Sequence, residues 1–472
     1  MQISFHDPDG AVFLIDNLIF RRVKVNVADR LRKFLETKIA NDLINEGLIP
    51  KTQELSHQDI EALMLKIKII GDADEYTWFS HEKIPFVSYA HEWVPEMLLD
   101  AAQMTVSLVQ RLHKAGWDLK DATSSNVVFR GTSPVFVDLC SIVERVTTQP
   151  YWWPKGQFER HFILPLLAYL SCGLSPAKIH FSYADGLDPE SLYDILGTDR
   201  WTSGLALKHC TLPVLLTARR WDPHQSTKGE GMSPDVCMAM QSWQIRSIEK
   251  SLISIRHKLP KPKSNWHTYT AERNHYSNQD LTSKRQVIKR WLQTYKPSTV
   301  LDVGANSGEF SQLAAAEGAS VYALEKDVDS ARVAHIRAKE YGYDCQVVLQ
   351  DIANPSPAMG WRQVEKKSLD QRVNCQVECV LALALVHHWL ASSLIPLPEI
   401  VMQLTRWTKS HLIIEYISPN DPMFETLSKQ RKLDFSWINR EVFIKKLSAD
   451  FLILEEVSLE TQRILFLCER RA

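Results

Sequence analysis

The stretch LDVGANSGEFS, residues 301–311, combines small residues with an acidic side chain in a way that suits nucleoside binding. Gly304 lets the chain turn sharply, and Gly308 allows a ligand and a helix to approach closely. Asn306 is the non-glycine residue type that best tolerates positive φ. A nucleotide-like ligand is therefore expected to lie against bare backbone at this turn.

The dinucleotide pattern Gly-x-Gly-x-x-Gly does not match this turn. Starting at Gly304, it would require glycines where the chain has Asn306 and Glu309. A carboxylate at 309 would repel a pyrophosphate, so NAD is disfavoured. An acidic-x-Gly-x-x-x-Gly pattern that begins at Asp302 does match.

Acidic residues close three successive apolar runs of strand length. Asp302 lies in TVLDV, Glu325 ends VYALE 21 residues after Gly304, and Asp351 ends CQVVLQD. Open α/β sheets bind ligands at the carboxyl ends of their strands. An acidic residue at such a position can also be the N-cap of the next helix, so each one alone is ambiguous. All three in register after a glycine turn favour a ligand site.

The fourth apolar run, LALALVHHWL, places His387 and His388 just beyond the carboxyl edge of the expected sheet. A histidine near neutral pH can take a proton from a hydroxyl or an amine, whereas helix capping or core packing is the alternative role. Glu415 and Tyr416 end the fifth run, and Asp421 follows. We predict His387, His388 and Glu415 as catalytic or acceptor-orienting residues, with Tyr416 and Asp421 as further acceptor-site candidates.

These residues need a parallel sheet to bring them together. Continuous apolar runs are typical of strands that are covered on both faces by helices. The runs occupy 299–303, 321–325, 345–351, 378–385 and 411–417. Two last strands, 451–457 and 463–469, are too close for a helical crossover and must run antiparallel. The sequence therefore predicts an α/β, Rossmann-like domain with a seven-stranded sheet.

The glycine turn and the three carboxylates resemble the class I S-adenosylmethionine-dependent methyltransferases. The resemblance implies that Asp302 lies near the methionine amino group, that Glu325 accepts from both ribose hydroxyls, and that Asp351 accepts from the adenine amino group. It implies S-adenosyl-L-methionine as the cofactor. The residues assigned to its site are Asp302, Gly304, Asn306, Gly308, Glu325, Lys326, Asp351, Ile352 and Leu383.

The amino-terminal half carries a second pattern. Asp121 and Asn126 are five apart, and Asp138 follows 12 residues later, beyond a predicted hairpin at 127–139. This resembles the catalytic core of protein-kinase-like and aminoglycoside-kinase-like enzymes, and the resemblance implies a base and two magnesium ligands. A strand-rich lobe followed by a helical lobe also fits that α+β fold, with ATP and magnesium as possible ligands.

The kinase-like pattern is degenerate. Gly10 is the only glycine between 10 and 23, and DLC stands where DFG is expected. Lys24 and Glu36 are the candidates for the nucleotide-pairing lysine and its helix partner. Residues 27–47 are predicted to form one long amphipathic helix. The alternative to phosphoryl transfer is a scaffold that builds a substrate-binding surface.

Taken whole, the chain resembles a bacterial, nodulation-protein-like group of methyltransferases. The matching stretches cover nearly its full length: HEWVPEMLLDAAQMT, GWDLKDATSSNVVF, PVFVDLCSI, QFERHFILPLLAY, LDVGANSGEFS, NPSPAMGW, LALALVHHWL and IIEYISPNDPM. The predicted division is a strand-rich lobe at 1–95, a helical lobe at 96–256, a linker at 257–266 and a methyltransferase domain at 267–472.

Composition limits the partners. The chain has 55 Lys plus Arg against 56 Asp plus Glu, so no overall field attracts nucleic acid. No apolar run approaches the ~20 residues of a membrane span, and the first ten residues lack the basic and apolar regions of a secretory signal, so a cytoplasmic location is expected. The nearest cysteine pair, Cys375 and Cys379, lacks a second pair of ligands, so no metal site is predicted.

The predicted function is methyl transfer to an oxygen or nitrogen of a small molecule, a glycan or a carrier-bound metabolite, in biosynthesis. The kinase-like domain would aid acceptor binding. Two alternatives are a bifunctional kinase and methyltransferase, and a non-catalytic scaffold that binds the cofactor. The sequence leaves the oligomeric state open.

Overall fold

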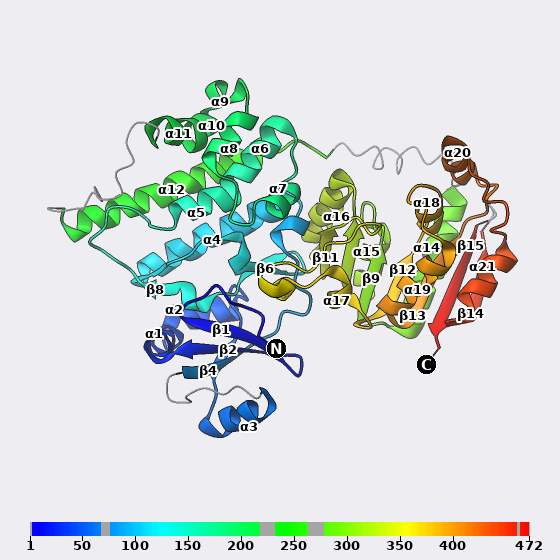
Figure 1. The fold of residues 1–472 in the computed structure, drawn as a ribbon, viewed down its shortest axis with the longest axis horizontal. Coiled ribbons are helices and arrows are strands. Elements are labelled where there is room, and N and C mark those ends of the chain that lie inside the picture. Colours follow the sequence, from blue (N-terminus) through cyan, green and yellow to red (C-terminus); the bar gives the residue numbers. More distant parts are fainter. Residues whose placement is uncertain (1, 68–75, 218–231, 263–277, 460–462, 472) are drawn as a thin grey trace. The chain divides into compact units, whose positions relative to one another are not determined.

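The computed structural model describes residues 2–67, 76–217, 232–262, 278–459 and 463–471 (Figure 1). The chain divides into two compact units. Unit 1 comprises Met1–Lys261 and Met359–Lys366, and unit 2 comprises Pro262–Ala358 and Lys367–Ala472. The main boundary lies inside the predicted linker at 257–266. The short segment Met359–Lys366 belongs to unit 1, although the sequence division places it in the second domain.

Unit 1 begins with an antiparallel sheet in the order β1-β2-β4-β3. The strands of unit 1 are Gly10–Ile15 (β1), Leu18–Lys24 (β2), Thr52–Glu54 (β3), Tyr76–His81 (β4), Trp117–Leu119 (β5), Val127–Arg130 (β6), Ser133–Phe136 (β7) and Ile142–Glu144 (β8). β6 and β7 form the predicted hairpin, with Val127 opposite Phe136 and Gly131 at positive φ in the turn.

Helices fill the rest of unit 1. They are Val25–Leu35 (α1), Lys38–Asn45 (α2), His57–Ile67 (α3), Pro95–Lys114 (α4), Lys155–Phe158 (α5), Leu164–Cys172 (α6), Pro176–Ser182 (α7), Pro189–Ile195 (α8), Asp199–Thr202 (α9), Gly204–Ala206 (α10), Leu212–Thr217 (α11) and Pro234–Lys258 (α12). The single helix predicted at 27–47 is wrong, because Thr37 interrupts it. Thr37 has extended ψ of 151°, and its Oγ1 accepts from Ala40 N as the N-cap of α2.

Unit 2 is built on a seven-stranded sheet in the order β11-β10-β9-β12-β13-β15-β14. Its strands are Thr299–Val303 (β9), Ser320–Glu325 (β10), Cys345–Leu349 (β11), Val377–Ala382 (β12), Thr408–Tyr416 (β13), Phe451–Ser458 (β14) and Ile464–Arg470 (β15). β9 to β13 pair in parallel, whereas β15 is antiparallel to both β13 and β14. The α/β fold, the parallel core and the antiparallel final pair match the prediction.

The helices of unit 2 alternate with these strands along the chain (Figure 1). They are Asn278–Tyr295 (α14), Glu309–Ala316 (α15), Val328–Tyr341 (α16), Leu369–Val373 (α17), Val386–Ala391 (α18), Leu397–Trp407 (α19), Pro422–Arg431 (α20) and Arg440–Leu447 (α21). Consecutive residues of β9, β11 and β12 are buried, as expected for strands with helices on both faces. Within the described residues, no helix is both long and apolar enough to span a bilayer.

Candidate cofactor site and neighbouring polar clusters

The glycine turn follows β9 and leads into α15. Gly304, Asn306 and Gly308 all have positive φ, at 75°, 52° and 78°. The Gly304 and Ala305 N–H groups both donate to Leu324 O of β10, at 2.9 and 3.0 Å, and this ties the turn to the neighbouring strand. The three residue types at the turn are therefore those that left-handed backbone favours.

The two glycines have different surroundings. A Cβ on Gly304 would lie 3.0 Å from the tip of the Leu385 side chain. A Cβ on Gly308 would lie 3.0 Å from the Cβ of Ala334 in α16. Gly308 thus allows close packing of α15 against α16, and its expected role in the approach of a ligand stays a prediction.

Glu325, at the end of β10, braces the turn. Its Oε2 accepts from Asn306 N at 2.7 Å, and its Oε1 accepts from the N–H groups of Lys326 and Asp327, each at 2.7 Å. Burial raises the pKa of Glu325, and the three N–H groups act in the opposite direction. The result is a carboxylate held at the strand end, where a ribose hydroxyl could donate to the lone-pair site that the three N–H groups leave on Oε2.

Asp302, in β9, is buried and accepts from Ser311 Oγ at 2.5 Å. The pKa of Asp302 is raised to about 6, mainly by burial. The charge of Glu325 acts in the same direction, whereas the Ser311 hydroxyl and the charge of Lys284 oppose the rise. A buried carboxylate of this kind gains from a cationic partner, because that partner restores the charged form. The methionine ammonium of the implied cofactor would be such a partner.

Asp351 follows β11 at the same sheet edge. Its Oδ1 accepts from Ala353 N at 3.0 Å, and its Oδ2 lies 3.3 Å from Lys326 Nζ. Ile352 is half-buried, and Leu383, just after β12, is buried. The fold thus places Asp302, Glu325, Asp351 and Leu383 at or just beyond the carboxyl ends of four adjacent parallel strands, with Ile352 directly after Asp351.

His387 and His388 lie in the first turn of α18, with ring centroids 4.2 Å apart. Burial lowers the pKa of His387 well below 6.5, and the charges of His388, Arg463 and Lys284 act in the same direction. Burial also lowers the pKa of His388 to about 4. Both rings are therefore neutral at pH 7. His387 is 3% exposed, and its Nδ1 has no hydrogen-bond partner among the described residues.

Glu415 is fully buried, and its Oε2 accepts from Lys284 Nζ at 2.6 Å and from Ala384 N at 2.8 Å. Sequence reasoning missed Lys284, which belongs to α14, because 131 residues separate it from Glu415. Tyr416 Oη donates to Ile438 O at 3.1 Å, and this bond ties the Tyr416 side chain to the segment just before α21.

Asp421 caps α20 and pairs with the buried Arg463, whose Nε lies 2.9 Å from Asp421 Oδ2. Both groups are less than a tenth exposed. Asp421 therefore stabilises the start of α20 in this structure.

In unit 1, the predicted Asp121 and Asn126 lie in one loop. Asn126 Nδ2 donates to Asp121 O at 3.4 Å, and Gln157 Nε2 donates to Asp121 Oδ1 at 3.0 Å. Val137 N donates to Asn126 O at 2.8 Å, which ties this loop to the segment before Asp138. The loop thus brings the three predicted residues into one region of the unit.

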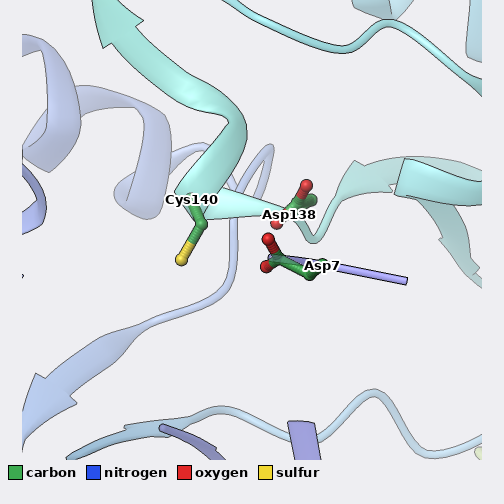
Figure 2. Close-up of side chains that lie close together, drawn as sticks. All are labelled: Asp7, Asp138 and Cys140. Atoms are coloured by element: carbon green, nitrogen blue, oxygen red, sulfur yellow. The ribbon is translucent and has the colours of Figure 1, made fainter. Parts of the chain in front are cut away.

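Asp138 lies close to Asp7 and Cys140 (Figure 2). One ligand atom from each of the three lies within 4.8 Å of the others, a spacing that a metal ion could bridge. Arg21 of β2 already neutralises this cluster: its Nη1 is 2.5 Å from Asp138 Oδ1 and 3.8 Å from Asp7 Oδ2. Burial lowers the pKa of Arg21, but Asp138 and Cys140 raise it by more, so the guanidinium stays charged. The cluster does not fit a magnesium ion.

Lys24 and Glu36 do not form the predicted pair. They flank the 11-residue helix α1 as its N-cap and C-cap residues, and both are exposed. At 1.5 Å per residue, such a helix holds its ends about 16 Å apart. The basic residue that reaches Asp138 is Arg21, on the same strand as Lys24.

The strand order of unit 2, its antiparallel last strand, the glycine turn and the strand-end carboxylates agree with the Rossmann-like α/β domain that the sequence predicts. The chain is 25% identical to the nodulation protein NoeA of Rhizobium meliloti (strain 1021) over 481 residues, which are 99% of this chain and 95% of NoeA. This confirms the full-length resemblance to a nodulation-protein-like group. No protein-family model matches the chain.

Solved structures were also compared. Magnesium protoporphyrin IX methyltransferase (ChlM) from Synechocystis PCC 6803, with bound SAH, gives a TM-score of 0.29 at 18% identity, over 41% of this chain and 84% of ChlM. The bifunctional kinase-methyltransferase WbdD gives a TM-score of 0.29 at 17% identity, over 40% of this chain and 39% of WbdD.

Proposed function

We propose that the chain transfers the methyl group of S-adenosylmethionine to an oxygen or nitrogen of a small-molecule, glycan or carrier-bound acceptor in the cytoplasm. The observation that carries the proposal is Glu325. This carboxylate is held by three backbone N–H groups beside a left-handed glycine turn, at the end of the strand next to β9. Such a rigid acceptor suits a ribose diol.

The residues of unit 2 have separate roles in this proposal. Asp302 pairs with the methionine ammonium, Glu325 accepts from the ribose hydroxyls, and Asp351 accepts from the adenine amino group. When bound, the cofactor supplies an electrophilic methyl group on a sulfonium. Alignment of the acceptor with that methyl supplies most of the acceleration.

His387 is the candidate base. Its ring is neutral at pH 7, because burial lowers its pKa, and its Nδ1 has no hydrogen-bond partner among the described residues. A neutral imidazole can accept the proton that a hydroxyl or amine loses on methylation. His388, with a pKa of about 4, is the second candidate. Glu415 is better placed to orient its neighbours than to take a proton from the acceptor, because its Oε2 already accepts from Lys284 Nζ and Ala384 N.

The test combines binding with product formation. Isothermal titration with S-adenosylhomocysteine should give a binding curve for the wild type that Asp302→Ala and Glu325→Ala abolish. Incubation of a metabolite extract with methyl-labelled cofactor should then label a product in the presence of the wild type. Glu340→Gln, on the exposed end of α16, is the control for both assays. Unchanged affinity in both alanine variants would overturn the proposal, and a labelled product would exclude a scaffold as the chain's sole role.

For unit 1 we propose a kinase-like lobe pair that helps to hold the acceptor and does not transfer phosphate. The strand-rich and helical parts and the Asp121–Asn126 loop support the kinase-like reading. The Arg21–Asp138 contact disfavours the magnesium that phosphoryl transfer would need. ATP turnover that Asp138→Ala abolishes would instead establish the bifunctional alternative.

A further inference from the structure

Lys284 and Glu415 form a buried ion pair under the carboxyl edge of the sheet. Lys284 Nζ lies 2.6 Å from Glu415 Oε2, and the two side chains are 3% and 0% exposed. Lys284 Nζ also lies 5.1 Å from the ring centroid of Phe310, in the helix that follows the glycine turn. One pair therefore links α14, β13 and the first turn of α15.

Stability alone explains this pair poorly. Two charges lose their hydration on burial, and replacement of a buried pair by apolar side chains is often neutral or stabilising. The pair also contacts the backbone that leads from β12 to α18. The same Glu415 Oε2 accepts from Ala384 N at 2.8 Å, so the lysine and the backbone of the β12 turn share one oxygen.

Ala384 is the point at which the chain leaves β12. Its φ is +50°, in the left-handed region that an alanine adopts only at a conformational cost. The Glu415 carboxylate holds this conformation through the Ala384 N–H. Two residues later α18 begins, with His387 in its first turn. The left-handed turn therefore sets where the His387 ring lies.

We propose that Lys284 is a positioning residue: through Glu415 it fixes the Ala384 turn, and thereby the place of His387 at the acceptor side of the site. The use of His387 in methyl transfer rests on the proposed function, whereas its position can be tested without any acceptor. Glu415, predicted as catalytic, acts in this account through the Ala384 N–H.

The experiment uses the full chain with ¹⁵N-labelled histidine, with the His387 ring signals assigned by their loss in His387→Gln. The variant is the double substitution Lys284→Met/Glu415→Leu, which removes both charges of the pair together rather than one alone. We expect the His387 ring signals to shift or broaden, while those of His161 and His180 in unit 1 stay unchanged. Amide exchange at Ala384 should become about tenfold faster.

The matched control is Lys289→Met/Glu317→Leu, which removes an ion pair of 3.5 Å between α14 and the end of α15 whose side chains are 51% and 21% exposed. It should leave the His387 ring signals and the Ala384 exchange as in the wild type. S-adenosylhomocysteine affinity should also stay within about threefold of the wild type in this control. A buried pair that only adds stability would leave the ring signals of the folded Lys284→Met/Glu415→Leu chain unchanged, and that outcome would overturn the proposal.

A second variant covers the case in which the double substitution prevents folding. Lys284→Arg keeps the charge but changes the reach of the donor, so we expect it to shift the His387 signals, and unchanged signals would contradict the proposal. If the wild type fails to bind S-adenosylhomocysteine, the proposed function fails, but the ring signals still decide the role of Lys284.

Discussion

Glu325→Gln tests the ribose contact most selectively, because it keeps the size of the side chain and removes one acceptor oxygen. In the structure, Oε1 accepts from Lys326 N and Asp327 N, and Oε2 accepts from Asn306 N. A glutamine can turn its oxygen to only one of these sides. Its NH₂ group would then face an N–H donor, and the Asn306 turn would lose its partner.

The expected loss of affinity follows from these contacts. A hydrogen bond to a charged group contributes about 1.5–3 kcal/mol. The substitution removes the charge and one acceptor, which amounts to about one such bond to the ribose diol. At 1.4 kcal/mol per factor of ten, the Kd for S-adenosylhomocysteine should rise about 10- to 100-fold.

Isothermal titration measures this change directly, and a thermal melt of each protein checks that the fold persists. Glu340→Gln is the matched control, since Glu340 is exposed on α16 and the change is chemically the same. It should bind as the wild type does. If Glu325→Gln binds within twofold of the wild type, the ribose does not lie at Glu325, and the assignment of the site is wrong.

Three further predictions concern stability and pH. The pKa of Asp302 is raised to about 6 in the folded chain, so the folded state binds the proton of this carboxyl more tightly than the unfolded state does. The free energy of unfolding of the wild type, relative to that of Asp302→Asn, should therefore fall by up to about 3 kcal/mol as pH rises from about 4 to 6. Chemical denaturation across that pH range measures the difference, and a difference that does not change with pH would contradict the prediction. Gly308→Ala should destabilise the chain by about 2–4 kcal/mol, because the strained φ and the 3.0 Å contact with Ala334 combine. Gly342→Ala should cost only about 1 kcal/mol, because its φ is also positive, at +67°, but no described atom lies within 4 Å of the added Cβ. Equal denaturation midpoints for the two variants would refute the packing role of Gly308. Asp138→Asn should cost about 1.5–3 kcal/mol, because the buried Arg21 exchanges a charged acceptor for a neutral amide oxygen and keeps only Asp7, at 3.8 Å, as a nearby carboxylate among the described residues. A loss below 1 kcal/mol in the same assay, or a rise of the wild-type melting temperature with Mg²⁺, would argue against the guanidinium as the resident cation.

Local sequence patterns predicted much of unit 2. The apolar runs at 299–303 and 345–351 gave strands with continuous burial, and the short spacing between 451–457 and 463–469 required the antiparallel pair. The strand-end carboxylates followed from the same periodicity, since a parallel sheet brings its carboxyl ends to one edge. These features depend on neighbours in the sequence, which is why they could be predicted.

The contacts that the sequence did not reveal are those between distant segments. No local pattern pairs Lys284 with Glu415, or Arg21 with Asp138, because the partners are 131 and 117 residues apart. Gly308 shows a related difficulty: a glycine can serve ligand approach, helix packing or both, and the packing against Ala334 is visible only in the folded chain. Threonine is a typical N-cap residue, so Thr37 indicates the start of a second helix, but the apolar spacing of 27–47 favoured one continuous helix.

We propose that the turn at 304–308, together with Asp302, Glu325 and Asp351, binds the nucleoside and amino-acid parts of S-adenosylmethionine. A crystal structure of the full chain grown with S-adenosylhomocysteine tests it most directly. We expect both ribose hydroxyls within 3.2 Å of Glu325 Oε1 or Oε2, about the length of a hydrogen bond, and the ammonium of the ligand nearest to Asp302. Density for the nucleoside at any other place, or none at saturating ligand, would contradict it.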